Sequence, residues 1–311
     1  MKFSVTIPAY KSLFLREAIE SVVSQTYSDW ELIIVDDCSP EDLKSIVTPF
    51  LTDQRIRYYR NEKNCGAVNV VNNWNICLSY CTGDYIICMG DDDRLLPCCL
   101  EEYKKLMEKY PKLNVYHVRT EIIDERGHVT KVLEERSETE DALTLMTKRW
   151  RGRSQYIGDF CFSRDHLDIC GGYYPVPYAW GSDDITVFRA ACLGGIANAN
   201  RTGFQYRENA QSISLTENGA EKIDAVLIQR EWHEKKLEEL HEHGIYPTEA
   251  IQEARQSLKR FATGQIAQKM KNDLRLGGLP RYWHWWRHYP REVFSRLTLV
   301  KIFIISITET P

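Results

Sequence analysis

The chain has 311 residues, of which 43% are hydrophobic and 27% are charged, and its formal net charge at pH 7 is −4. These values are typical of a globular protein long enough for two domains, and the small net charge argues against nucleic acid as a partner. No apolar run reaches the roughly 20 residues that a membrane span needs. The ten cysteines form no paired Cys-x-x-Cys motifs and no secretory signal pattern opens the chain, so we expect reduced thiols in a cytosolic protein.

The first part of the chain alternates strand and helix patterns. Ser39 is the expected N-cap of one helix, with Pro40 at its first helical position. Alternation of this kind predicts an α/β fold with a mostly parallel sheet. The strand-like runs cover residues 3–7, 31–35, 56–59, 85–89 and 115–123, and the helical periodicity covers residues 13–25, 40–51, 67–80 and 96–110.

The second part is less regular. Residues 124–155 look irregular and charged, and after Ser214 two long polar helices with apolar stripes are expected. We therefore predict a catalytic α/β domain over residues 1–215 and a helical region over residues 216–311. The expected elements are strands at 154–162 and 196–206 and helices at 184–192, 221–243 and 248–271.

Three short polar segments directly follow predicted strands. They are Pro8-Ala9-Tyr10, Asp36-Asp37 and Asp91-Asp92-Asp93. Ligands of parallel α/β sheets bind outside the carboxyl ends of the strands, so the three segments should lie along one edge. Three adjacent carboxylates repel one another, and a hard cation would neutralise them. An Asp-x-Asp pair with a divalent ion is suited to binding the diphosphate of a nucleotide.

These motifs resemble the large family 2 of inverting glycosyltransferases, which have the GT-A fold. The matching stretches are residues 4–10, 21–27, 30–39, 64–66 and 83–87, the last leading into the aspartate triplet. The resemblance covers about residues 3 to 210 and is most specific in the first half. It implies a Rossmann-like, mostly parallel central sheet with flanking helices, plus a helical C-terminal region.

The resemblance also implies roles for the three segments. Pro8, Tyr10 and Asp37 would bracket the nucleotide base, with the Asp37 carboxylate accepting a hydrogen bond from a ring N–H. Asp93 would be the direct metal ligand. Asp91 would bind the ribose or reach the metal through water.

The same family resemblance extends to the metal and the phosphates. Asp92 would shape the loop between the two metal-site aspartates. The ion would be Mg²⁺ or Mn²⁺, because oxygen ligands and phosphates favour hard cations. Arg207 matches a position that helps to hold the pyrophosphate.

An inverting transfer also needs a base, because the attacking hydroxyl of the acceptor must lose a proton. The family supplies an aspartate from a Glu-Asp motif at the start of a helix, and residues 180–189 depart from that pattern. Counting back from Arg189 favours Asp183 as the base, and counting forward from Trp180-Gly181 favours Asp184. We favour Asp183, and the other acid would complement the helix macrodipole.

The segment 279–307 is rich in tryptophan, tyrosine and basic residues. Between Lys269 and Lys301 there are eight Lys or Arg residues and two acids. Interfacial aromatics and clustered cations predict a tail that lies on an anionic membrane surface. The enzyme would then be peripheral on the inner face of the plasma membrane. Docking of the tail on the domain, or on the second subunit of a homodimer, is the alternative.

These observations predict a metal-dependent inverting glycosyltransferase. Its donor would be a nucleoside-diphosphate sugar, with a UDP-sugar favoured, and its acceptor a hydroxyl of a glycan or lipid-linked glycan. Two alternatives remain open. A sugar nucleotidyltransferase usually has a glycine-rich loop after its first strand, whereas residues 8–12 contain no glycine. A non-catalytic nucleotide- or sugar-binding module is favoured only by the altered Glu-Asp motif.

Overall fold

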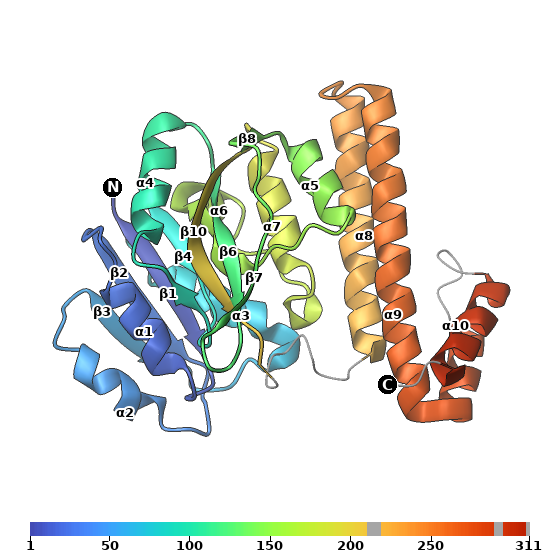
Figure 1. Cartoon of the computed structure of the whole chain (residues 1–311), viewed down its shortest axis with the longest axis horizontal. Coiled ribbons are helices and arrows are strands. Elements are labelled where there is room, and N and C mark those ends of the chain that lie inside the picture. The colour runs from blue at the N-terminus through green and yellow to red at the C-terminus, as the bar shows by residue number, and fades with distance from the viewer. Residues whose placement is uncertain (210–218, 289–294, 309–311) are drawn as a thin grey trace.

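The computed structural model describes residues 1–209, 219–288 and 295–308. Figure 1 shows an α/β part, at the left, joined to a long helical hairpin and a shorter outer helix at the right. The strands are β1 Phe3–Ala9, β2 Trp30–Asp36, β3 Ile56–Arg60, β4 Tyr85–Cys88, β5 Arg94–Leu95, β6 Val115–Ile123, β7 Val129–Val132, β8 Thr139–Glu140, β9 Phe160–Ser163 and β10 Ile196–Arg207.

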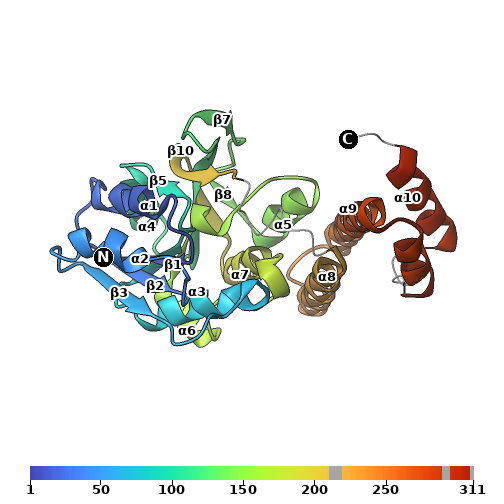
Figure 2. The same ribbon diagram turned by 90° about the horizontal axis from the view of Figure 1, so that it is seen from below.

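The helices flank the sheet in the α/β part and form the remainder of the chain. Figure 2, turned by 90°, shows α8 and α9 end-on beside α5 and α7, with α10 beyond α9. The helices are α1 Leu15–Val23, α2 Leu43–Val47, α3 Val70–Ser79, α4 Cys99–Lys109, α5 Ala142–Trp150, α6 Arg164–Ile169, α7 Ser182–Ala191, α8 Gly219–Glu242, α9 Thr248–His288 and α10 Arg296–Thr308.

The ten strands form one mostly parallel sheet in the order β3-β2-β1-β4-β9-β6-β10-β5, with β7 on β6 and β8 on β10. Strands β3, β2, β1 and β4 are parallel neighbours, as are β6 and β10. Strand β9 lies antiparallel between β4 and β6. The α/β class and the mostly parallel central sheet predicted from the sequence are confirmed.

The core lies on both faces of this sheet. In β2, Ile33 and Val35 pack with helices α3, α5 and α7, whereas Leu32 and Ile34 pack with α1, α2 and α4. Successive side chains of a strand point to opposite faces, so a strand covered on both faces is a continuous apolar run. This explains why all the residues that follow Glu31 in the run 31–35 are apolar and do not alternate with polar residues.

Strand β1 runs two residues further than predicted and includes Pro8. The carbonyl of Thr6 accepts a hydrogen bond from Met89 N, on the β4 side, and that of Ala9 accepts from Asp37 N, on the β2 side. The hydrogen-bonding groups of successive residues in β1 point alternately to β4 and to β2, so the backbone of Pro8 faces the β4 side. At this level, beyond Cys88, β4 has ended. The missing N–H of Pro8 therefore breaks no ladder hydrogen bond.

The predicted start of the helix at residues 40–51 is wrong. Helix α2 begins at Leu43, and its N-cap is Asp42, whose carboxylate accepts a hydrogen bond from Ser45 N at 3.1 Å. Ser39 instead donates its hydroxyl to the carbonyl of Tyr10 at 2.6 Å. The Ser39 side chain therefore ties two loops at the sheet edge together and does not start a helix.

The expectation of irregular structure over residues 124–155 is also wrong in part. Helix α5 lies within it, capped by Asp141, whose carboxylate accepts from Thr144 N at 3.0 Å. Its buried face, which includes Leu145, Met146 and Trp150, has helical spacing that the charged neighbours obscured. The predicted strand at 154–162 is shorter and later than expected, since β9 begins at Phe160.

The helical region is built on an antiparallel pair, α8 and α9, which packs on α5 and α7. Helix α9 is longer than predicted and bends at Gly278, whose φ is 55°. None of the described helices has the length and apolarity that crossing a bilayer would require. The predicted boundary at residue 215 falls in the segment 210–218, outside the described residues.

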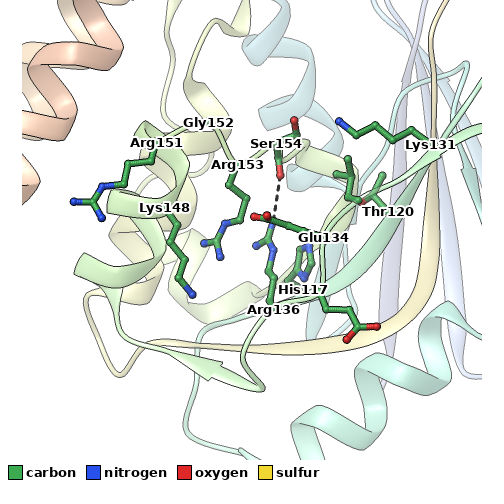
Figure 3. Close-up of a pocket in the computed structure, with 12 residues that line it drawn as sticks. His117, Thr120, Lys131, Glu134, Arg136, Lys148, Arg151, Gly152, Arg153 and Ser154 are labelled. Carbon is green, nitrogen blue, oxygen red and sulfur yellow. Dashed lines mark hydrogen bonds between the residues drawn. The ribbon is translucent and has the colours of Figure 1, made fainter.

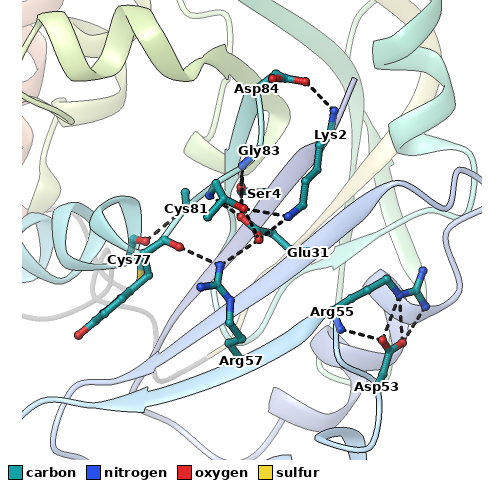
Figure 4. Close-up of polar contacts among 12 residues, drawn as sticks. Lys2, Ser4, Glu31, Asp53, Arg55, Arg57, Cys77, Cys81, Gly83 and Asp84 are labelled. Carbon is teal, nitrogen blue, oxygen red and sulfur yellow. Dashed lines mark hydrogen bonds and ion pairs between the residues drawn. The ribbon is translucent and has the colours of Figure 1, made fainter.

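A buried carboxylate, Glu31, links three strands at the edge of the sheet opposite the aspartate triplet (Figure 4). Its oxygens accept hydrogen bonds from Lys2 Nζ at 2.8 Å, Ser4 Oγ at 2.6 Å and Arg57 Nη2 at 2.9 Å. The backbone N of Thr82 also donates to it at 2.6 Å. Burial opposes ionisation, but these donors outweigh it and lower the pKa of Glu31 to about 2.

We predict that Glu31→Gln lowers the free energy of unfolding by about 1–3 kcal/mol at pH 7, because two cations lose their shared carboxylate. A group with a lowered folded-state pKa stabilises the fold above its unfolded-state pKa of about 4.3. The deficit should therefore shrink as the pH falls from about 4.3 toward the folded-state pKa of about 2. Urea unfolding at several pH values measures it. A deficit that is constant with pH would contradict this role.

Candidate active site

A cavity of about 460 Å³ opens at the carboxyl ends of β1, β2 and β4. It brings together all three polar segments predicted from the sequence, as expected for the binding edge of an α/β sheet. The predicted residues that line it are Pro8, Tyr10, Asp37, Asp91, Asp92 and Asp93. Sequence reasoning missed other lining residues, namely Lys11, Asn64, Trp74, Ile157 and Tyr206.

Asp91 closes the loop after β1. Its Oδ2 accepts hydrogen bonds from the backbone N of Tyr10 and of Lys11, both at 2.7 Å. Burial, and then the charge of Asp92, raise the pKa of Asp91 above the usual carboxyl range. The side chain therefore fixes the Tyr10 loop over the end of β4, and its second oxygen forms no hydrogen bond or ion pair with a described residue.

Asp93 is held in the same way from the other side. Its Oδ1 accepts from the backbone N of Arg207 at 3.0 Å, and its Oδ2 accepts from Gly90 N at 3.3 Å. Burial and the nearby Asp92 raise its pKa well above the ordinary value. Two carboxylates whose ionised forms are disfavoured in this way would be stabilised by a cation placed between them and the cavity.

Asp92 is the member of the triplet whose carboxylate is paired with other side chains. Its Oδ2 lies 3.5 Å from Lys11 Nζ and accepts from Asn209 Nδ2 at 2.8 Å. Lys11 is thus a cation of the cavity that contacts the triplet directly. A basic residue three positions after Pro8, close to the end of β1, was the sequence signal that could have identified it.

Arg207 does not line the cavity. Only 1% of the residue is exposed, and its guanidinium stacks on the Phe14 ring, with 4.0 Å from Cζ to the ring centroid. Its Nη2 donates to Glu17 Oε2 at 2.7 Å, and its Nε donates to the carbonyl of Asp92 at 2.8 Å. The remaining donor, Nη1, bonds the carbonyls of residues 124 and 125. The guanidinium donors are therefore directed at the protein, around the base of the triplet loop.

The residues predicted to bind the base line the same cavity. Tyr10 is 44% exposed, which leaves its ring face open to a planar ligand. The Asp37 carboxylate is buried and accepts from Cys65 N at 2.9 Å and from Asn61 Nδ2 at 2.8 Å. A carboxylate has about four acceptor positions, so Asp37 keeps capacity for a further donor.

The two acids at the start of α7 have different surroundings. Asp184 is fully buried, and its Oδ1 accepts from Arg149 Nε at 2.8 Å and from Gln155 Nε2 at 2.7 Å. Its Oδ2 accepts from Gln229 Nε2, of α8, at 2.8 Å. Both carboxylate oxygens of Asp184 are therefore hydrogen-bonded to side chains of the protein.

Asp183 is half-buried and accepts no side-chain hydrogen bond from another described residue. Burial, and then the negative charge of Asp184, raise its pKa to about 8. A carboxylate with a raised pKa and free acceptor positions is able to take a proton, whereas the locked Asp184 is not. The surroundings of the two residues that the sequence left ambiguous are therefore different.

The donor set of the triplet fits a divalent cation that also binds phosphate. Among the described residues, no group of three or more His, Cys, Asp or Glu side chains could hold an ion unaided. Mg²⁺ typically takes one or two carboxylates and completes its coordination with water and substrate phosphates. Asp93 and Asp91, buried at the edge of an open cavity, match that requirement.

Comparisons with solved structures show the fold. The chain is similar to S. aureus TarS 1–349, with a TM-score of 0.66 and 15% identity over 99% of this chain and 81% of that one. It is also similar to GalNAc-T7, solved with UDP, GalNAc and Mn²⁺, with a TM-score of 0.51 and 15% identity over 68% of this chain and 44% of that one.

Comparisons with curated proteins match the α/β part. The protein EpsE of Bacillus subtilis (strain 168) is 35% identical over 115 residues, which are 36% of this chain and 40% of EpsE. A Campylobacter jejuni GalNAc(5)-diNAcBac-PP-undecaprenol beta-1,3-glucosyltransferase is 31% identical over 132 residues, 42% of this chain and 41% of that protein. The chain thus matches less than half the length of these relatives.

The family model described as Glycosyl transferase family 2 matches residues 4–173, more than half of the chain. The match includes the segments that form the cavity from β1, β2 and β4 and stops before α7. The chain belongs to glycosyl transferase family 2 and has its GT-A fold.

Proposed function

We propose that the chain transfers a sugar from a nucleoside-diphosphate sugar, with a UDP-sugar favoured, to a hydroxyl of a glycan or lipid-linked glycan. Family membership and the cavity at the sheet edge support this. The TarS neighbour has been solved with UDP-GlcNAc, and the Campylobacter relative is named for an undecaprenol-linked glycan. The observation that carries the proposal is the meeting of the Asp triplet and Tyr10 in one cavity, whose lining also includes Tyr178, five residues before Asp183.

In this proposal the donor lies along the cavity. The base stacks on Tyr10 beside Pro8 and donates to Asp37, and the diphosphate extends toward the triplet. Asp93 and Asp91 would hold Mg²⁺ or Mn²⁺, which would neutralise the charge of the departing diphosphate. Lys11, already 3.5 Å from Asp92, supplies a second positive charge at that end.

Arg207 acts on the donor only through the triplet in this proposal. Its backbone N binds Asp93, its Nε binds the Asp92 carbonyl, and Glu17 neutralises its charge. These contacts favour a positioning role over the direct pyrophosphate contact expected from the sequence.

Asp183 is the proposed base of an inverting displacement. The acceptor hydroxyl attacks the anomeric carbon while the nucleoside diphosphate leaves, and Asp183 takes the hydroxyl proton. Asp184 keeps the first turn of α7 in place through Arg149 and Gln229. Trp180 lies nearby, with Lys269 Nζ of α9 3.5 Å from its ring centroid, so the helical region supports the loop before the base.

We also propose that the chain consists of a catalytic α/β domain and a helical region that meet near residue 215. The outer end of the helical region carries an exposed apolar surface, which we call the tail surface, with Leu279 63% exposed and Leu297 66% exposed. Buried Trp285 and Leu299 join α9 to α10 beneath it. The same segments of α9 and α10 contain Arg281, Arg287, Arg296 and Lys301.

Exposed apolar residues in segments that also contain Lys and Arg favour binding to an anionic lipid surface. We therefore propose peripheral attachment at the inner face of the plasma membrane. A lipid-linked acceptor would be presented at the same surface.

For the donor site, we predict that UDP with Mn²⁺ raises the melting temperature of the wild type and that Asp93→Asn abolishes this shift. The reason is that the diphosphate and the ion share Asp93 as a ligand. Differential scanning fluorimetry measures the shift. The matched control is Asp165→Asn, an exposed aspartate of α6, which should behave as the wild type. An unchanged shift in Asp93→Asn would place the nucleotide elsewhere.

For the base, we predict that Asp183→Asn lowers kcat at least about 100-fold while UDP still binds, because only proton transfer is lost. Asp184→Asn should instead lower the melting temperature, since Arg149 loses its buried counter-charge. Transfer of radiolabelled sugar to an acceptor glycan, or hydrolysis of the donor, measures the rate.

The pH dependence follows from the same assignment. A base must be unprotonated, so kcat/KM should rise with pH until the raised pKa of Asp183, about 8, is passed. A rise that ends near pH 4, where an ordinary aspartate titrates, would contradict this. An Asp184→Asn variant that is fully stable yet inactive would contradict the assignment of Asp183 as the base.

For the tail surface, we predict that Leu279→Ser with Leu297→Ser reduces co-sedimentation with vesicles of anionic lipid and leaves donor hydrolysis unchanged. The paired control, Val129→Ser on the exposed strand β7, should still co-sediment. Sedimentation velocity on the same samples tests the alternative, in which a second subunit covers the tail surface. A wild-type dimer that dissociates in the double variant, without lipid binding, would assign the surface to a second subunit.

A further inference from the structure

A second cavity, of about 560 Å³, lies beside β6 and is separate from the donor cavity. Its walls are β6, the segment that follows β7, and the C-terminal turn of α5 (Figure 3). Five of its lining side chains are cationic and two are acidic. The cations are Lys131, Arg136, Lys148, Arg151 and Arg153.

Arg136 is the least expected of these cations, because it is only 6% exposed. Its Nη2 reaches the carbonyl of Ser154 at 3.4 Å, and its Nη1 is buried without a hydrogen-bond partner among the described residues. Burial, and then the nearby charge of Arg153, lower the pKa of Arg136 to about 10. A buried guanidinium with an unused donor is costly unless a ligand occupies the vacant direction.

Three of the five cations of this cavity have carboxylate partners, and one of them, Arg151, pairs with Glu253 of α9. Glu140 is shared between Lys148 Nζ, at 2.7 Å, and Arg153 Nη1, at 2.9 Å. Glu135 pairs with Arg119, outside the cavity lining, at 3.0 Å. Lys131 has no ion pair among the described residues.

Two further acids lie near Arg136. Glu134 is exposed, and its charge favours the protonated form of Arg136. Asp159 is fully buried behind Thr120, and burial raises its pKa to about 7. Asp159 is a stronger counter-charge for Arg136 than Glu134 is, but it lies buried behind Thr120. Glu134 and Glu135 are the exposed acids of the lining.

We propose that this cavity is a binding site for a phosphate group, carried as inorganic phosphate, diphosphate or a sugar phosphate. Arg136 and Arg153 would supply guanidinium N–H groups, and Lys131 would supply a point charge at the mouth. Figure 3 shows these side chains coming from different segments of the wall. The volume exceeds that of a phosphate and leaves space for an attached sugar.

The site is next to the proposed base without being part of the donor cavity. In the segment 148–155, Lys148, Arg151 and Arg153 line the second cavity, whereas Arg149 and Gln155 hold Asp184. Arg149 Nη1 also donates to the carbonyl of Arg153 at 3.1 Å. A bound phosphate would thus order the segment that fixes the first turn of α7.

Calorimetric titration of the full chain tests the site with three probes: inorganic phosphate, pyrophosphate and glucose 1-phosphate. The buffer contains EDTA, so that a diphosphate cannot bind the triplet through a divalent ion. We expect the probes to bind the wild type. Their affinity for Arg136→Gln should be weaker by roughly tenfold or more, because a charged donor is lost. Asp93→Asn, in the donor cavity, should bind the probes as the wild type does.

Two exposed positions provide variants that leave the buried packing alone. Lys131→Gln should weaken probe binding and Glu134→Gln should strengthen it, each about two- to fivefold, since they change one charge of opposite sign. Lys112→Gln, an exposed lysine outside the cavity, is the matched control. These opposite shifts carry the test if Arg136→Gln does not fold.

The outcomes are distinct. Tighter binding of glucose 1-phosphate than of phosphate supports a site for a sugar phosphate, and equal affinity supports one for the free ion. The proposal is overturned if no probe binds, if Lys131→Gln and Glu134→Gln shift binding in the same direction, or if Asp93→Asn abolishes binding. Because the titration contains no donor and no divalent ion, its failure leaves the proposed transferase activity untouched.

Discussion

Mutual repulsion among Asp91, Asp92 and Asp93 is the constraint around which the binding edge is organised. The two outer carboxylates are buried. Asp91 is held by backbone N–H groups of the loop after β1, and Asp93 by the backbone N–H of Arg207. Arg207 binds the same loop through its Nε and through its backbone N. The last residue of β10 is thereby tied to the end of β4, although the two strands are not neighbours in the sheet. The cavity exists because these polar contacts join three strand ends.

The helical region completes this edge. Gln229 of α8 reaches Asp184 at 2.8 Å, and Gly181, with φ 92°, lies so close that a Cβ there would be 2.4 Å from the Gln229 side chain. A glycine is needed at this position both for its backbone conformation and for the approach of α8. The unequal surroundings of Asp183 and Asp184 therefore depend on a helix beyond the family-model match.

Much of the α/β part could be predicted from the sequence, because its strands are continuous apolar runs and its polar segments follow them directly. The ambiguity between Asp183 and Asp184 could not be resolved, because it depends on Arg149, Gln155 and Gln229, which are remote in the chain. Helix α5 was missed because charged segments flank its short apolar run. The contacts of Arg207 with Glu17 and with the Asp92 carbonyl could not be predicted, since sequence order does not reveal which way a guanidinium points.

The central claim is that Asp93 and Asp91 hold a divalent cation against the diphosphate of the donor. A crystal structure of the full chain with a UDP-sugar and Mn²⁺, with anomalous data collected for manganese, tests it most directly. We expect one anomalous peak at bonding distance from Asp93 and from the diphosphate, with the base on Tyr10. A nucleotide bound elsewhere, or an ion remote from both aspartates, would contradict the claim.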